Sequence, residues 1–170
     1  GSHFGVIGQR FDAAGSAVGI DFQINSYTAS AQRAPAMAAD SSGNFVVAWS
    51  SYLQDGSFSG VFGQLFNPEA VPIGIELQVN TYTTSEQRDA AVAANGLGGL
   101  VVAWMSKLQD GSTWGVYGQR LNSTGSPVGG EFRVNTYTLG TQSRPAVASD
   151  NSGNFVVVWE SGHDGSGWGV

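Results

Sequence analysis

One sequence pattern recurs about every 55 residues along this 170-residue chain. Three segments carry it most clearly, and their first residues lie 55 positions apart: Gly5–Phe11, Gly60–Phe66 and Gly115–Leu121. The terminal pair Gly169-Val170 opens a fourth copy after 54 residues, because the third copy lacks one residue near His163. A fixed period of this length is typical of repeat architectures, in which each copy is one supersecondary unit that packs on the next.

Each copy contains four strand candidates separated by turn residues. In the first full unit the candidates are Ala34–Ala39, Asn44–Ser50, Gly60–Phe66 and Ile75–Asn80. The second is apolar on both faces, which indicates burial on both sides, and the fourth alternates polar and apolar residues, which indicates one buried face. With 25 glycines and only 12% charged residues, the composition suits short strands and tight turns better than amphipathic helices.

Four short antiparallel strands per unit are typical of a β-propeller blade, so we predict an all-β fold with three blades per chain. A β-sandwich is the alternative with the same strand count. Residues 1–3 have the composition of an expression-tag remnant. The remainder divides into four parts: a half-blade at 4–28, full units at about 29–83 and 84–138, and a half-blade at 139–170.

The two half-blades are complementary in sequence. The N-terminal half carries a third and a fourth strand, and the C-terminal half carries a first and a second strand. Three blades are too few for a propeller ring, which takes about 4 to 8. We therefore predict that the ring closes between chains, most simply as a homodimer with six blades.

Charge and residue content exclude several function classes. A net charge of −6 with scattered basic residues argues against nucleic acids and anionic membranes as partners. The absence of cysteine removes disulfides and thiol chemistry. No cofactor motif is present, the one internal histidine is His163, and the acids lie singly along the chain, so we predict a protein that is not an enzyme.

Several motifs of the third copy resemble tandem repeats of large bacterial secreted proteins, among them adhesin-like and calcium-binding, hemolysin-type polypeptides. They are Gly-Val-Tyr-Gly-Gln-Arg (115–120), Phe-Arg-Val-Asn-Thr-Tyr-Thr (132–138), Gly-Asn-Phe-Val-Val-Val-Trp (153–159) and Gln-Asp-Gly-Ser (109–112). The resemblance covers residues 4–170 and implies an extracellular or cell-surface location without a defined activity. The Gly-Asp-rich nonapeptides that bind calcium in hemolysin-type proteins are absent, so that role is not carried over.

The Asp-Gly-Ser turns form a second set of candidates. Segments 110–114 and 164–168 resemble the Asp-box turn of sialidase-type propellers but are one residue shorter, and that likeness implies a fold and no chemistry. Asp55, Asp110 and Asp164 could ligate Ca²⁺, which takes 6 to 8 oxygens. The alternative is that each aspartate caps its own turn while the glycine supplies a positive φ.

Candidate ligand-binding residues recur where the outer strand leaves for the next blade and beside the Asp turns. Tyrosine, amide and arginine side chains together could hold a sugar or a carboxylate. The candidates are Tyr27, Tyr82, Tyr137, Gln32, Arg33, Gln87, Arg88, Arg144, Trp114 and Trp168. The alternative for this set is a structural role at each crossover. Trp49, Trp104 and Trp159 end the apolar strands and are expected in the core.

These features predict a non-catalytic binding or adhesion module of an exported bacterial protein, with a glycan as one candidate ligand. Two alternatives remain open: an architectural or oligomerisation scaffold, and a fragment of a sialidase-like propeller enzyme. The near-identity of the copies favours the scaffold, because binding sites usually diversify surface positions whereas packing does not.

Overall fold

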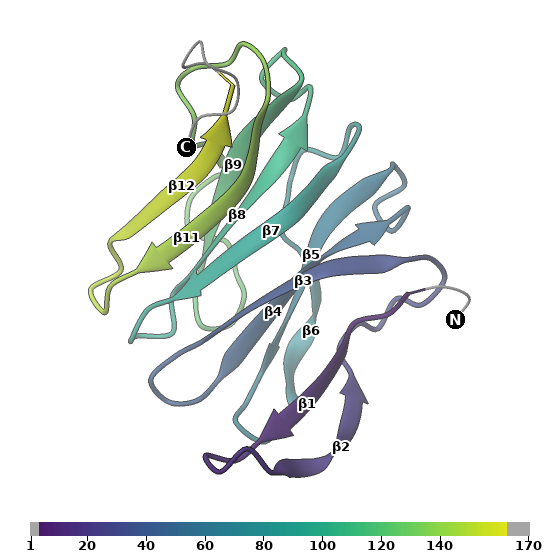
Figure 1. The fold of residues 1–170 in the computed structure, drawn as a ribbon, viewed down its shortest axis with the longest axis vertical. Coiled ribbons are helices and arrows are strands. Elements are labelled where there is room, and N and C mark those ends of the chain that lie inside the picture. Colours follow the sequence, from purple (N-terminus) through teal and green to yellow (C-terminus); the bar gives the residue numbers. More distant parts are fainter. Residues whose placement is uncertain (1–3, 163–170) are drawn as a thin grey trace.

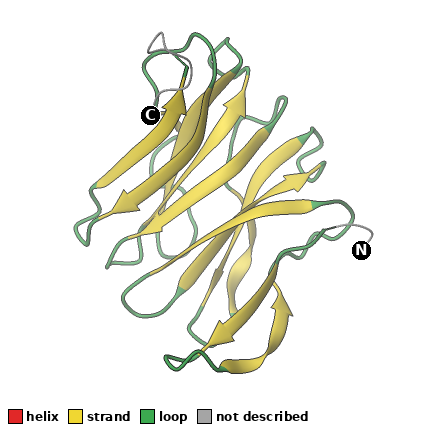
Figure 2. Cartoon of the chain, viewed as in Figure 1, coloured by secondary structure: helices red, strands yellow, loops and turns green. Residues whose placement is uncertain are grey.

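The structure, a computed structural model, describes residues 4–162, and every regular element in these residues is a β-strand (Figures 1 and 2). The described residues therefore include no helix long and apolar enough to cross a membrane. The predicted all-β class is confirmed. The strands are β1 (Ile7–Phe11), β2 (Ala17–Gln23), β3 (Gln32–Ala39), β4 (Phe45–Tyr52), β5 (Ser59–Phe66), β6 (Pro72–Gln78), β7 (Gln87–Ala94), β8 (Leu100–Lys107), β9 (Trp114–Leu121), β10 (Phe132–Arg133), β11 (Gln142–Ser149) and β12 (Phe155–Ser161).

The strands form two four-stranded sheets and two two-stranded sheets, all antiparallel. The full sheets have the orders β3-β4-β5-β6 and β7-β8-β9-β10, and the short ones are β1-β2 and β11-β12. Figure 1 shows the four sheets in a row along the chain, from β1-β2 in purple to β11-β12 in yellow. Within the 55-residue period, β1-β2 corresponds to β5-β6, and β11-β12 corresponds to β3-β4. Successive meander sheets of this kind give the chain a propeller-like fold.

Successive sheets bury their faces against one another, as the second strand of each copy predicted. On β4, Val46 and Ala48 join a core cluster with Val92 of β7 and Trp104 of β8. The alternate residues Val47 and Trp49 join a second cluster with β1-β2. Trp49 and Trp104 are fully buried and Trp159 is half-buried, so the first two have the predicted core position.

The fourth strand departs from its predicted alternation at Ile75, which is exposed, and at Asn80, which is buried. Val79 is buried, but Ile75 is 85% exposed. The pairing Gly63↔Leu77 is followed by Leu65↔Ile73, so β6 contributes two more residues than β5 across this bulge. Gly74, with φ of +70°, allows the turn in the backbone. Ile75 lies in the bulge and points away from the core, so its predicted burial is wrong.

Candidate functional site

The crossover between sheets is built on a buried asparagine–glutamine pair. Asn80 Oδ1 accepts a hydrogen bond from Val61 N at 2.7 Å, and Asn80 Nδ2 donates to Tyr82 O at 2.8 Å and to Gln87 Oε1 at 3.3 Å. Asn25 makes the corresponding bonds to Val6, Tyr27 and Gln32. These amides satisfy backbone groups that the strand ends leave unpaired.

The predicted glutamine ligands are therefore parts of the fold. Gln32, Gln87 and Gln142 are 2% exposed or less, so their amides do not reach a ligand on the surface. The prediction that they contact a ligand finds no support in this burial. Tyr27 and Tyr82 are half-buried at the same crossovers, and Tyr137 is exposed.

Trp114 and Arg88 are brought together at the end of the second full sheet. The guanidinium of Arg88 lies 4.6 Å from the centre of the Trp114 ring, and Lys107 Nζ lies 5.6 Å from it. Arg33 lies in the same way over Phe4, at 4.4 Å. Such cation–π contacts hold the guanidinium planes on aromatic faces at the rim of the sheets. Trp168 lies outside the described residues.

The Asp-Gly-Ser turns take the capping conformation. Asp55 Oδ1 accepts from Ser57 N at 3.0 Å and Asp110 Oδ1 from Ser112 N at 3.1 Å, and Gly56 and Gly111 have positive φ. Each turn supplies one carboxylate. Residues 4–162 contain no group of three or more His, Cys, Asp or Glu that could hold a metal ion. The hydrogen bonds are those of the turn interpretation. Asp164 lies outside the described residues.

One titratable group beside these turns is perturbed. Burial in the second sheet raises the pKa of the Tyr117 hydroxyl above its usual 10.0, and the negative charge of Asp110 raises it further. The cause is the cost of a phenolate in an apolar, negatively charged surrounding. Tyr117 belongs to the core cluster that the two full sheets share.

A β-bulge interrupts the innermost strand of three sheets, namely β3, β7 and β11. The pairing Arg88↔Met105 is followed by Ala91↔Ala103, and β3 and β11 show the same shift. The residue in the bulge adopts a left-handed conformation in all three strands: Ala34, Asp89 and Arg144 have φ near +50°. Left-handed non-glycine residues are uncommon, and bulges of this kind re-aim side chains, often beside functional sites.

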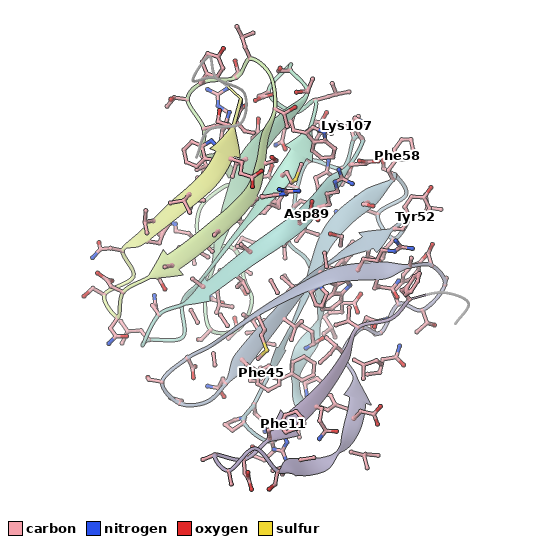
Figure 3. All side chains as sticks on the ribbon, in the orientation of Figure 1. Phe11, Phe45, Tyr52, Phe58, Asp89 and Lys107 are labelled. Atoms are coloured by element: carbon pink, nitrogen blue, oxygen red, sulfur yellow. The ribbon has the colours of Figure 1, made fainter. Side chains whose placement is uncertain are left out.

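A cleft of about 470 Å³ lies where the bulge of β7 meets the ends of β3 and β4. Figure 3 shows Tyr52, Phe58, Asp89 and Lys107 at this end of the sheets, away from Phe11 and Phe45. The lining residues are Ala31, Arg33, Ala34, Ser50, Tyr52, Ser59, Glu86, Arg88 and Asp89. The cleft thus carries two arginines, two acids, an aromatic ring and hydroxyl groups.

The cleft contains part of the predicted site and adds residues that the sequence did not single out. Arg33 and Arg88 were predicted and lie in it, whereas the crossover tyrosines do not line it. The sequence did not single out Glu86 and Asp89, because their positions along the chain do not show which residues of the neighbouring sheet lie opposite them. The prediction of a non-catalytic chain rested on acids that lie singly. Glu86 and Asp89 line the same cleft, so that premise does not hold.

Interactions within the cleft already orient its polar groups. Arg88 Nε lies 3.7 Å from Asp89 Oδ2, and Asp89 N donates to Ser50 Oγ at 3.2 Å. In the third copy, Arg144 Nη1 donates to Glu160 Oε1 at 3.1 Å. Charged groups therefore lie at the start of the innermost strands of both the second and the third copy.

The copies differ at most of the cleft positions and agree at a set of buried amide, tryptophan and serine positions. Positions that are buried in the first two copies repeat the same residue three times: Asn25/Asn80/Asn135, Gln32/Gln87/Gln142, Trp49/Trp104/Trp159 and Ser51/Ser106/Ser161. Cleft positions change: Ala31/Glu86/Thr141, Ala34/Asp89/Arg144, Ser50/Met105/Glu160 and Tyr52/Lys107/Gly162. Packing needs the same residues in every copy, whereas a binding site needs its chemistry only once.

No protein-family model and no curated protein matches the chain. Two solved structures are similar in fold. An endo-arabinase from Bacteroides thetaiotaomicron VPI-5482 superposes with a TM-score of 0.53 and 12% identity, over 90% of this chain and 59% of that one. The α-L-arabinanase of Penicillium chrysogenum, complexed with arabinobiose, gives a TM-score of 0.52 and 17% identity, over 80% of this chain and 41% of that one. The chain thus spans about three-fifths or less of these neighbours, and the likeness concerns the fold.

Proposed function

We propose that this chain is a glycan-binding propeller module whose ligand occupies the cleft between β3, β4 and β7. The observation that carries the proposal is the diversity of the cleft positions, in contrast to the buried amides, tryptophans and serines that repeat in every copy. The varied positions include the three equivalent left-handed bulge residues Ala34, Asp89 and Arg144. The diversity of the cleft positions counts against the scaffold alternative, which the similarity of the copies had favoured.

The chemistry of the cleft suits a small saccharide. Arg33 and Arg88 offer guanidinium donors, and Glu86 and Asp89 offer acceptors, so that both kinds of partner for sugar hydroxyls face one space. Tyr52 adds a ring face for stacking. The volume of about 470 Å³ lies within the range of about 300–1,000 Å³ for small-molecule sites. The arabinobiose bound by one structural neighbour is the first ligand to test.

Calorimetric titration with arabinobiose and with arabinan oligosaccharides tests the proposal. We expect Arg88→Ala to weaken binding at least about tenfold, the effect of losing a charge-assisted hydrogen bond. Arg120→Ala is the matched control, because Arg120 is an exposed arginine on β9 that does not line the cleft. Equal affinities for the two variants, or no saccharide binding by the parent chain, would refute the proposal.

A second candidate function is glycoside hydrolysis. One observation favours it: Glu86 and Asp89 line the same cleft, and glycosidases use a pair of carboxyl groups. Both structural neighbours are arabinan-degrading enzymes by name. Release of reducing sugar from arabinan, lost in both Glu86→Gln and Asp89→Asn, would establish this activity. Binding that leaves the polysaccharide intact would restrict the function to recognition. The exported, cell-surface setting implied by the repeat resemblance stays a prediction.

A further inference from the structure

The two half-sheets at the ends of the row each lack neighbours that the full sheets have. Within residues 4–162, β1 pairs only with β2, whereas its counterpart β5 lies between β4 and β6. In the same residues β12 pairs only with β11, whereas its counterpart β4 lies between β3 and β5. Each half-sheet therefore has one strand edge, along Ile7–Phe11 and along Phe155–Trp159, that no other strand of the described residues covers. The strand that β1 lacks is the counterpart of β12.

Backbone hydrogen bonds show which groups of β1 are left at its edge. Val6 N donates to Asn25 Oδ1 and Val6 O accepts from Ile24 N, so the polar groups of Val6 point toward β2. In an antiparallel strand the next residue points the other way, and the N–H and C=O of Ile7 face the open edge. In the full sheet, the corresponding residue Phe62 pairs with Trp49 of β4.

Apolar side chains beside these edges are exposed where their counterparts are buried. On β1, Ile7 is 57% and Phe11 63% exposed, against 5% and 1% for Phe62 and Phe66. On β12, Val156 is 59% and Val158 52% exposed, against 2% for Val46 and 0% for Ala48. Contiguous exposed apolar surface of this kind marks an interaction site.

A groove lies beside β1 on the side where the missing strands would pack. It has a volume of about 470 Å³ and lies between the open edge of β1 and the faces of β3 and β4. Met37 of β3 lines the groove and is 63% exposed, whereas its counterpart Val92 is 9% exposed under the preceding full sheet. The groove is lined mainly by apolar residues, which matches the valines exposed on β12.

We propose that β12 of one chain pairs with β1 of a second copy, so that each half-sheet completes the other and two chains close into a ring of six blades. The register follows from the intact β4-β5 pair: Phe45↔Phe66, Val46↔Leu65 and Trp49↔Phe62 correspond to Phe155↔Phe11, Val156↔Arg10 and Trp159↔Ile7 between chains. The interface is isologous, because each chain gives its β12 to the partner's β1 and receives the reverse. Pairing within one chain is disfavoured, since both full sheets lie between the half-sheets and three blades are below the usual 4 to 8 (Figure 1).

Sedimentation of the 170-residue chain gives the first test. We expect one species of twice the 17.7 kDa chain mass at micromolar concentration. A monomer at about 100 µM would overturn the proposal, since an edge strand and both apolar faces would then stay uncovered.

Disulfide trapping tests the register, and the absence of native cysteine makes it unambiguous. Val156 and Arg10 correspond to Val46 and Leu65, a pair whose backbone groups point away from each other, where side chains lie closest. We expect Arg10→Cys with Val156→Cys to form a covalent dimer under oxidising conditions. In the matched control the first cysteine is placed at Arg120 and not at Arg10. Arg120 holds the same position on β9 but already pairs with Val101.

The control pair Arg120→Cys with Val156→Cys is expected to stay monomeric on a non-reducing gel. Equal cross-linking of both pairs would overturn the proposed register. A ladder of higher oligomers from the first pair would overturn the closed ring of two chains. Circular dichroism of both double variants confirms that they fold, so that a negative result counts against the proposal. Saccharide binding is measured separately and does not enter either outcome.

Discussion

Asn80 offers the sharpest test of the claim that buried amides join one sheet to the next. The side chain is 3% exposed and makes three hydrogen bonds, to Val61 N, Tyr82 O and Gln87 Oε1. Replacing Asn80 by alanine removes all three. The partner Val61 is fully buried, so water cannot replace the bond to its N–H.

The expected cost follows from these contacts. A buried donor or acceptor left without a partner costs about 1–3 kcal/mol. With the Val61 N–H, the Tyr82 carbonyl and the Gln87 amide all losing a partner, we expect Asn80→Ala to lower the free energy of unfolding by about 3–4 kcal/mol. That is a large part of the usual total of about 5–15 kcal/mol for a domain.

Urea unfolding followed by tryptophan fluorescence measures this loss, with Asn122→Ala as the matched control. Asn122 Oδ1 also accepts from two backbone amides, Thr124 N at 3.0 Å and Ser126 N at 2.9 Å, but the residue is exposed. Water satisfies those amides after substitution, so we expect a loss of about 0.5–1 kcal/mol. Losses that agree within about 0.5 kcal/mol would refute the reasoning, because burial would then not decide the cost.

Three further predictions use other parts of the chain. Stability should fall as pH rises above about 10, because burial raises the pKa of Tyr117 in the folded state and the unfolded chain releases that proton first. In a series of melting temperatures measured at alkaline pH, Tyr117→Phe should reduce this loss of stability. Trp104→Ala should cost about 3–5 kcal/mol, since the side chain is fully buried, whereas Trp114→Ala at the half-buried rim should cost clearly less in the same urea assay. Gly125→Ala should lower the melting temperature more than Gly140→Ala. Both glycines have positive φ, but a Cβ at Gly125 would lie 2.8 Å from Leu77 Cδ2, whereas one at Gly140 would meet open space. Equal shifts in melting temperature would contradict the packing argument.

The sequence by itself determined the repeat, the strand content and the double-sided burial of the second strand. These properties are local and periodic: a 55-residue recurrence, β-branched runs such as Phe45–Tyr52, and glycine turns read the same way in every copy. The capping interpretation of Asp55 and Asp110 was available for the same reason, because an Asx turn closes within a few residues of itself.

Only the tertiary structure decided which polar residues share a site. Glu86, Asp89, Ser50 and Tyr52 meet because β7 packs beside β3 and β4, and no spacing along the chain states that contact. The recurrence of Gln87 was interpreted as a sign of ligand binding. In the structure its side chain is buried and accepts a hydrogen bond from Asn80 within the crossover. The bulge at Asp89 likewise depends on pairing with β8. Periodicity reports what every copy must do to pack, whereas a site lies where neighbouring copies meet and differ.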